Sequence, residues 1–148
     1  MPRPLPQPAR SFPYRVKRLY LLVTQSIDDA VKPFGIGRTQ WQVLSRVQRA
    51  GTKTQRELQA ILQVEPATLS NVVDALVTKG WLERLENPAD KRSRVLRLTP
   101  DGAARYARIP NPVTEVERTM LQGVSAEERA SVEGVLQRMI ENLERGRE

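Results

Sequence analysis

Five cationic side chains lie within fourteen residues around a predicted tight turn, and only Glu86 and Asp90 oppose them. An Arg guanidinium is always charged and weakly hydrated, and the negative potential of a narrow DNA minor groove attracts it. A protruding hairpin with these charges therefore predicts contact with double-stranded DNA. The alternative is a solvated hairpin whose charges form local ion pairs. The five cations are Arg84, Lys91, Arg92, Arg94 and Arg97.

A second group of candidate residues lies on a helix predicted to begin at Pro66. Its apolar residues recur on one face, so the opposite face carries small and polar side chains. Such a face suits the major groove, where Asn71 can pair with an adenine edge and Thr68 can contact a thymine methyl. An ordinary solvated helix face is the alternative. The exposed set is Ala67, Thr68, Ser70, Asn71 and Asp74.

A third group, Lys53, Gln55 and Arg56, lies at the predicted start of the preceding helix. Backbone N–H groups at a helix start favour phosphate, so these residues are candidates for DNA backbone contact. A plain exposed helix start explains them equally well.

The elements that position these groups follow from local signals. Residues 39–50 read as a helix opened by a capping box at Thr39, and Thr54-Gln-Arg-Glu57 is a second box. Pro66 opens the next helix, so the two short helices form a helix-turn-helix. Residues 81–86 and 94–99 then predict two strands joined by a turn. The order predicts a winged helix over about 38–99.

Helices are also predicted on either side of the winged helix. Residues 12–33 form one, and residues 100–145 form helices interrupted by Pro110 and Pro112, the last opened by a capping box at Ser125. Their apolar stripes predict dimerisation, because a two-helix arm offers little neighbouring surface. The fold class is mostly α with a small β-wing, in one domain over 12–148. Residues 1–11 predict a flexible Pro-rich arm.

The amino-acid composition excludes several classes of function. The 148 residues carry a formal net charge of +7 and contain no His and no Cys. Thiol and imidazole chemistry are therefore excluded, and no carboxylate pair or phosphate-binding glycine loop is apparent. We predict that the protein is not an enzyme and binds no metal and no cofactor.

The charge is distributed unevenly along the chain. Residues 1–108 hold 19 basic and 9 acidic side chains, whereas residues 109–148 hold 5 basic and 8 acidic side chains. The basic part predicts a nucleic-acid partner. No segment predicts a membrane span or a signal peptide, so we expect a cytoplasmic protein.

Several short motifs occur in an order that resembles the multiple-antibiotic-resistance regulator (MarR) family of bacterial transcription factors. They are Trp41-Gln-Val-Leu44, Thr54-Gln-Arg-Glu-Leu58, Ala67-Thr-Leu-Ser70, Lys79-Gly-Trp-Leu-Glu-Arg84, Asn87-Pro-Ala-Asp-Lys-Arg92 and Leu96-Arg-Leu-Thr-Pro-Asp-Gly102. The resemblance spans residues 12–145. It implies a homodimer with intertwined terminal helices, bound to a palindromic operator that is usually repressed.

The resemblance also implies residue roles. Asp90 and Arg92 match the family's wing pair, whose Arg enters the minor groove, and Lys91 and Arg94 flank it. Pro66, Ala67, Thr68, Ser70 and Asn71 match its recognition helix. Ser70 and Arg84 match positions that contact salicylate in some relatives, so a small aromatic or phenolic acid is the implied effector. Arg84 contacting only phosphate or Glu86 is the alternative.

The chain departs from the family pattern in three ways. First, the family often has Arg at the positions of Asn71 and Ala75. Second, Pro110 and Pro112 interrupt a helix that is usually continuous in the family. Third, the chain has no Cys and no His, which excludes the peroxide-sensing and zinc-sensing branches. The main hypothesis is thus a homodimeric, cytoplasmic repressor of a palindromic operator, associated with the nucleoid when bound. The alternative is a winged-helix protein-interaction module with only non-specific DNA binding.

Overall fold

The computed structural model describes residues 11–147. The predicted Pro-rich arm over 1–11 lies outside these residues except for Ser11, which caps the first helix by accepting a hydrogen bond from the Tyr14 N–H. The chain divides into two compact units, and the boundary between them in the sequence lies between Pro112 and Val113. The single domain predicted over 12–148 stays a prediction, and each unit is described separately.

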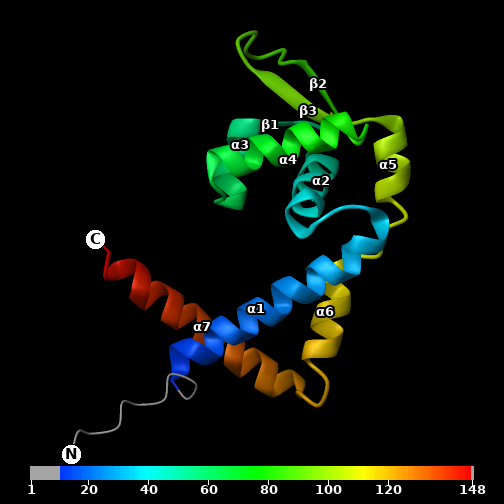
Figure 1. Cartoon of the computed structure of the whole chain (residues 1–148). Helices are drawn as coiled ribbons and strands as arrows, with labels where there is room; N and C mark the ends of the chain where they lie inside the picture. The colour runs from blue at the N-terminus through cyan, green and yellow to red at the C-terminus, as the bar shows by residue number, and fades with distance from the viewer. Residues whose placement is uncertain (1–10, 148) are drawn as a thin grey trace, which may run out of the picture. The chain divides into compact units, whose positions relative to one another are not determined.

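The first unit contains the elements that carry the predicted DNA contacts (Figure 1). They are α1 (Phe12–Val31), the 3-10 helix η2 (Lys32–Phe34), α2 (Arg38–Ala50), β1 (Lys53–Thr54), α3 (Gln55–Leu62), α4 (Pro66–Thr78), β2 (Leu82–Glu86), β3 (Arg94–Leu98) and α5 (Pro100–Tyr106). This order confirms the winged helix and the predicted breaks after α1 and α5.

The helix-turn-helix is formed by α3 and α4. Gln63 takes a left-handed conformation with φ 51° between the two helices, where a glycine or asparagine is more usual. The side-chain amide of Gln59 donates a hydrogen bond to the Val64 carbonyl, which holds this turn. The apolar face of α4 is buried at Leu69, Val73 and Leu76. The core therefore determines which face of α4 points to solvent.

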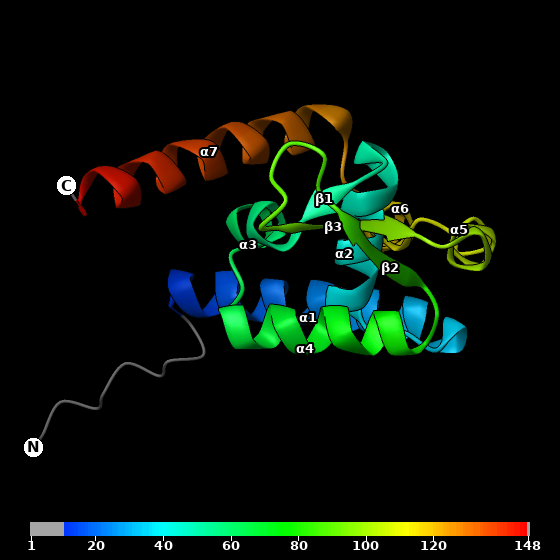
Figure 2. The same cartoon turned by 90° about the horizontal axis from the view of Figure 1, so that it is seen from above.

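The sheet has three antiparallel strands in the order β1-β3-β2. We predicted only two, because β1 is a two-residue strand with no periodic pattern. Lys53, expected at the start of a helix, instead pairs with Leu96 in β1. Register in the hairpin places Arg84 opposite Leu96 and Glu86 opposite Arg94. Figure 2 shows the chain leaving the end of α4 and turning back into β2.

The start of α2 differs from the prediction as well. The helix begins at Arg38, one residue before the predicted range 39–50, and its N-cap is Gly37 instead of Thr39. The Asp28 carboxylate of α1 accepts the Arg38 backbone N–H at 2.7 Å, and the Gln40 side chain accepts the Gly37 N–H at 3.1 Å. A residue ten positions away thus supplies one of the caps, and a local sequence pattern does not contain that information.

One apolar cluster holds the first unit together. Its fully buried side chains come from α1, α2, α3, α4 and both wing strands, and they include Val31, Leu44, Leu58, Leu69, Leu76, Leu82 and Leu96. Helix α4 and the wing therefore pack on the same core. Their relative placement follows from burial of apolar surface.

The second unit contains α6 (Pro112–Met120), whose first residue lies at the end of the first unit, and α7 (Ala126–Arg145). Ser125 caps α7 through the predicted box with Glu128. Arg129 of α7 forms ion pairs with Glu117 of α6 and with Glu133. None of the residues of α7 is buried. No helix within residues 11–147 is long and apolar enough to cross a bilayer.

Candidate nucleic-acid interface

The face of α4 predicted to read DNA points to solvent. Pro66, Ala67, Thr68 and Asn71 are exposed and Ser70 is half-buried. Glu65, the N-cap residue before α4, makes no side-chain hydrogen bond to the start of the helix. The first N–H groups of α4 consequently remain available to an acceptor such as phosphate. Apart from Asp74, this face presents uncharged, short side chains on a helix.

The turn of the wing is held by its own polar side chains. The Asn87 amide donates to the Ser93 hydroxyl at 2.8 Å, and its carbonyl accepts the Ala89 N–H at 3.0 Å. The Asp90 carboxylate accepts the backbone N–H of Arg92 at 3.0 Å. Asp90 thus binds the backbone of Arg92 and not its guanidinium. Asp90 therefore shapes the loop that presents Lys91 and Arg92.

The five wing cations divide into paired and unpaired groups. Arg97 binds Glu83 across the hairpin, with its Nη2 2.6 Å from Glu83 Oε1, and Arg84 binds Asp74 of α4. Lys91, Arg92 and Arg94 are exposed, and their side chains form no ion pair with any residue of the described chain. The positive charge available to a polyanion is therefore concentrated at and beside the tip of the wing.

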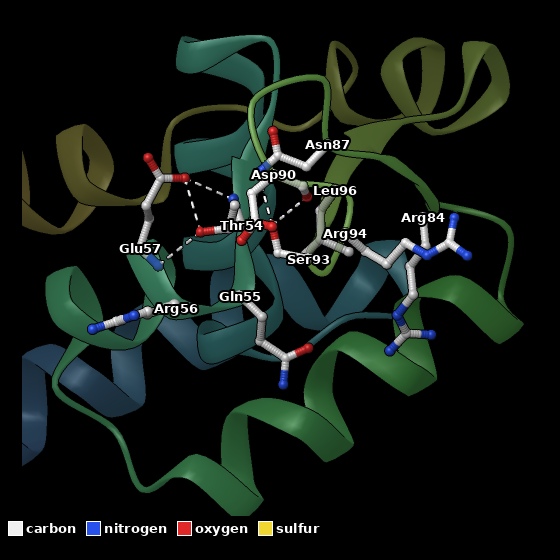
Figure 3. Close-up of a pocket in the computed structure, with 10 residues that line it drawn as sticks. All are labelled: Thr54, Gln55, Arg56, Glu57, Arg84, Asn87, Asp90, Ser93, Arg94 and Leu96. Carbon is white, nitrogen blue, oxygen red and sulfur yellow. Dashed lines mark hydrogen bonds between the residues drawn. The ribbon is translucent and has the colours of Figure 1, made fainter.

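A groove of about 540 Å³ lies between the start of α3 and the wing (Figure 3). It brings together Gln55, Arg84, Asp90 and Arg94 from the predicted site residues, whereas Ser70 is not among its lining residues. Arg56, which the sequence also indicated, adds a further cation. The full lining is Thr54, Gln55, Arg56, Glu57, Arg84, Asn87, Asp90, Ser93, Arg94 and Leu96.

The wall of this groove at α3 is built by the Thr54 capping box. The Glu57 carboxylate accepts the Thr54 backbone N–H at 2.7 Å, and the Thr54 hydroxyl accepts the Glu57 N–H at 3.1 Å. The hydrogen bond from the Thr54 backbone N–H is the main cause that lowers the pKa of Glu57, with the Thr54 hydroxyl and the charge of Lys53 acting in the same direction. Lys53 Nζ lies 3.9 Å from Glu57. Lys53 is thus partly neutralised, in contrast to the cations at the wing tip.

Two contacts of the site were not predicted from the sequence. Asn87 and Ser93 form a hydrogen bond across the wing turn, and Asp74, already named on the exposed face of the helix, binds Arg84. Asn87 precedes a proline and lies in the turn predicted between the two strands, whereas its hydrogen bond to Ser93 was not predicted. The partners of Ser93 and Asp74 lie six and ten residues away, and no helix or strand period links them. Within residues 11–147 no three metal-binding side chains gather as a candidate metal site.

A helix-turn-helix beside a positively charged, hydrogen-bonded wing defines the winged-helix class. A sequence model described as the MarR family matches residues 34–93. The multiple antibiotic resistance protein MarR of Salmonella typhimurium is 35% identical over 128 residues, which cover 83% of this chain and 89% of that protein. The chain belongs to the MarR family, and so it is a transcriptional regulator and not an enzyme.

Solved structures agree in fold. A mutant of Escherichia coli MarR in complex with operator DNA has a TM-score of 0.76 and 30% identity, over 91% of this chain and 99% of that one. A structure of the multiple antibiotic resistance repressor MarR has a TM-score of 0.70 and 28% identity, over 87% of this chain and 94% of that one. These matches confirm the mostly α fold with a small wing.

Proposed function

We propose that this protein is a homodimeric repressor that binds an inverted-repeat DNA operator through α4 and the wing. The observation that carries the proposal is the group of unpaired cations Lys91, Arg92 and Arg94 beside a helix face whose one acidic residue, Asp74, is already paired with Arg84. Arg92 enters the minor groove, and Thr68 and Asn71 meet base edges in the major groove. Pro66, Ala67 and Ser70 complete the helix surface, and Lys53 and Gln55 lie near the DNA backbone.

Two features support DNA as the ligand. The cationic wing tip and the uncapped start of α4 both favour phosphate, and they belong to elements packed on one core. The related E. coli protein has been solved with operator DNA. We infer that the protein acts in the cytoplasm and associates with the nucleoid when bound.

Dimerisation is the second part of the proposal. A two-fold dimer presents two copies of α4 to successive major grooves, about 34–36 Å apart, which is why the operator is an inverted repeat. The apolar residues that remain exposed on α1 and α7 supply the contact surface.

Selection of bound sequences from a random DNA pool tests the proposal. We expect an enriched palindrome with half-sites about one helical turn apart. Competition between that duplex and a scrambled one at about physiological salt then measures discrimination. A pool with no enriched repeat, together with equal competition, contradicts the repressor and favours the protein-interaction module.

The groove supports a small aromatic or phenolic acid as the effector that relieves repression. Its volume of about 540 Å³ suits such a molecule, and a guanidinium binds a carboxylate through two parallel hydrogen bonds. Arg84 already binds Asp74, so an effector carboxylate at Arg84 must compete with that ion pair. Calorimetric titration with phenolic acids tests this idea. An Arg84→Gln variant that binds as tightly as the wild type contradicts it.

A further inference from the structure

The recognition helix has an unusual charge. Asp74 is the only charged residue among the thirteen of α4, which contains no Lys and no Arg. Asp74 lies three residues after Asn71 and seven after Ala67, so it shares the solvent-facing side of the helix with them. A bare carboxylate on this face would be repelled by DNA phosphates.

Arg84 of β2 balances this charge. Its Nη2 donates to Asp74 Oδ1, and the side chains are 36% and 60% exposed. The strand register places Arg84 opposite Leu96, so Arg84 lies on the same face of the hairpin as Arg94, at the groove. A guanidinium in this position would reach for phosphate if Asp74 did not hold it. The ion pair therefore removes one negative and one positive charge from the same surface.

The pair also joins the two elements that read DNA. Asp74 belongs to the helix and Arg84 to the wing, so their contact restrains the angle between α4 and the hairpin. A specific complex needs the helix and the wing in their two grooves at the same time. Non-specific association needs only phosphate contacts and does not depend on the angle between α4 and the hairpin.

We propose that Asp74 is a positioning residue that sets sequence discrimination: it withholds Arg84 from phosphate and orients the wing relative to α4. The inference rests on the proposed DNA-binding function. It gives the acidic residue on the recognition helix a role in rejecting incorrect DNA, at the expense of total affinity.

The test compares Asp74→Asn, which keeps the size of the side chain, with Arg84→Gln and the double variant. Kd is measured for the selected repeat and for a scrambled duplex over a range of salt concentrations. We expect Asp74→Asn to bind scrambled DNA about fivefold to tenfold more tightly, with a salt slope steeper by about 0.9, since one more phosphate contact forms. Affinity for the repeat does not gain by this factor, so discrimination falls.

The other variants separate this role from a merely structural one. Arg84→Gln leaves Asp74 bare and weakens binding to both duplexes, opposite to the effect of Asp74→Asn on scrambled DNA. The double variant returns the scrambled Kd and its salt slope to near wild-type values. Asp74→Glu, which keeps the charge, stays close to the wild type.

An Asp74→Asn protein whose scrambled-DNA affinity is unchanged or weaker overturns the inference. So does a loss of affinity of the same size and sign in both single variants, because that result indicates a purely structural pair. If the wild type shows no preference for the repeat, the proposed function fails separately. The scrambled-DNA measurements still decide whether Asp74 restrains Arg84.

Discussion

Arg92 and Arg97 have the same side chain and belong to the same hairpin, but only one of them is unpaired. Arg97 gives two hydrogen bonds to Glu83, from Nε at 2.9 Å and from Nη2 at 2.6 Å. Arg92 lies at the turn, exposed, with only its backbone N–H bound to Asp90. The two residues therefore form a matched pair for measuring how much a free cation contributes to DNA binding.

We expect Arg92→Ala to weaken operator binding by about 10- to 100-fold, since it removes a groove contact worth about 1–3 kcal/mol. Arg97→Ala, as the control, loses much less affinity because Glu83 already neutralises that guanidinium. Both variants should remain folded and dimeric. Fluorescence anisotropy with labelled operator measures the affinities. Wild-type affinity in Arg92→Ala contradicts the assignment of the wing.

Glu57 is a single residue from which we predict that the stability of the folded protein depends on pH. Its pKa is lowered chiefly by the Thr54 backbone N–H, so ionised Glu57 stabilises the folded protein. For a lowered pKa this contribution is complete above the ordinary carboxyl value, about 4.3, and is lost as the pH falls through the lowered folded value. The cap at the start of α3 therefore weakens in acid.

We expect the stability of the wild type to fall relative to Glu57→Gln as the pH is lowered from about 6 to about 3, since Gln does not titrate. Urea unfolding of the two proteins at each pH measures the difference. An identical pH dependence of both proteins contradicts the assigned role of Glu57.

At the scale of elements, α5 packs directly against Trp81, the residue that precedes the first wing strand β2. Gly102 is buried in its first turn, and a Cβ at that position would lie 2.1 Å from the Trp81 carbonyl oxygen. The Thr99 hydroxyl accepts the Gly102 N–H at 2.8 Å and donates to the Gly80 carbonyl at 2.6 Å. Arg105 covers Trp81, with its guanidinium carbon 4.3 Å from the ring centre. Close backbone contact thus joins α5 to Trp81, the residue before β2.

Gly102→Ala should lower the free energy of unfolding by about 1–3 kcal/mol, because backbone atoms must move to admit the methyl group. Gly134→Ala in α7 is the control: an added Cβ there meets no atom within 4 Å, and we expect a gain of up to about 1 kcal/mol. Chemical denaturation measures both changes. Equal stability of the two variants contradicts the tight contact between α5 and Trp81.

At the scale of the whole molecule, each unit leaves apolar surface uncovered. On α1 the predicted stripe is buried only at Ile27 and Val31, while Leu19 and Tyr20 are 50% and 60% exposed. On α7, Val132, Leu136, Ile140 and Leu143 are all exposed. Surfaces of this kind are typical of contacts between chains, and they support the proposed dimer.

Leu136→Glu should shift the protein from dimer to monomer, because it places a charge within the apolar stripe of α7. Ser131→Glu adds the same charge on the opposite side of the helix and should leave the dimer intact. Sedimentation velocity measures the oligomeric state. A monomeric wild type, or dissociation of both variants alike, contradicts the role of this stripe. Operator affinity should fall together with dimerisation.

Local signals in the sequence predicted most of the helices and the class of the site. The boxes at Thr54 and Ser125 and the Pro66 helix start each involve neighbours within about four residues, so their spacing is visible in the chain. The wing cations were equally visible, because their chemistry does not depend on their partners.

The role of each of these residues depends on contacts between parts of the chain that are far apart in the sequence. Strand β1 exists because Lys53 pairs with Leu96, α2 starts where Asp28 caps it, and Asp74 meets Arg84 only after α4 and β2 pack on a common core. No periodicity links such residues. Packing alone therefore determined which cations are neutralised and which remain free for DNA, since an ion pair depends on distance in space and not on spacing along the chain.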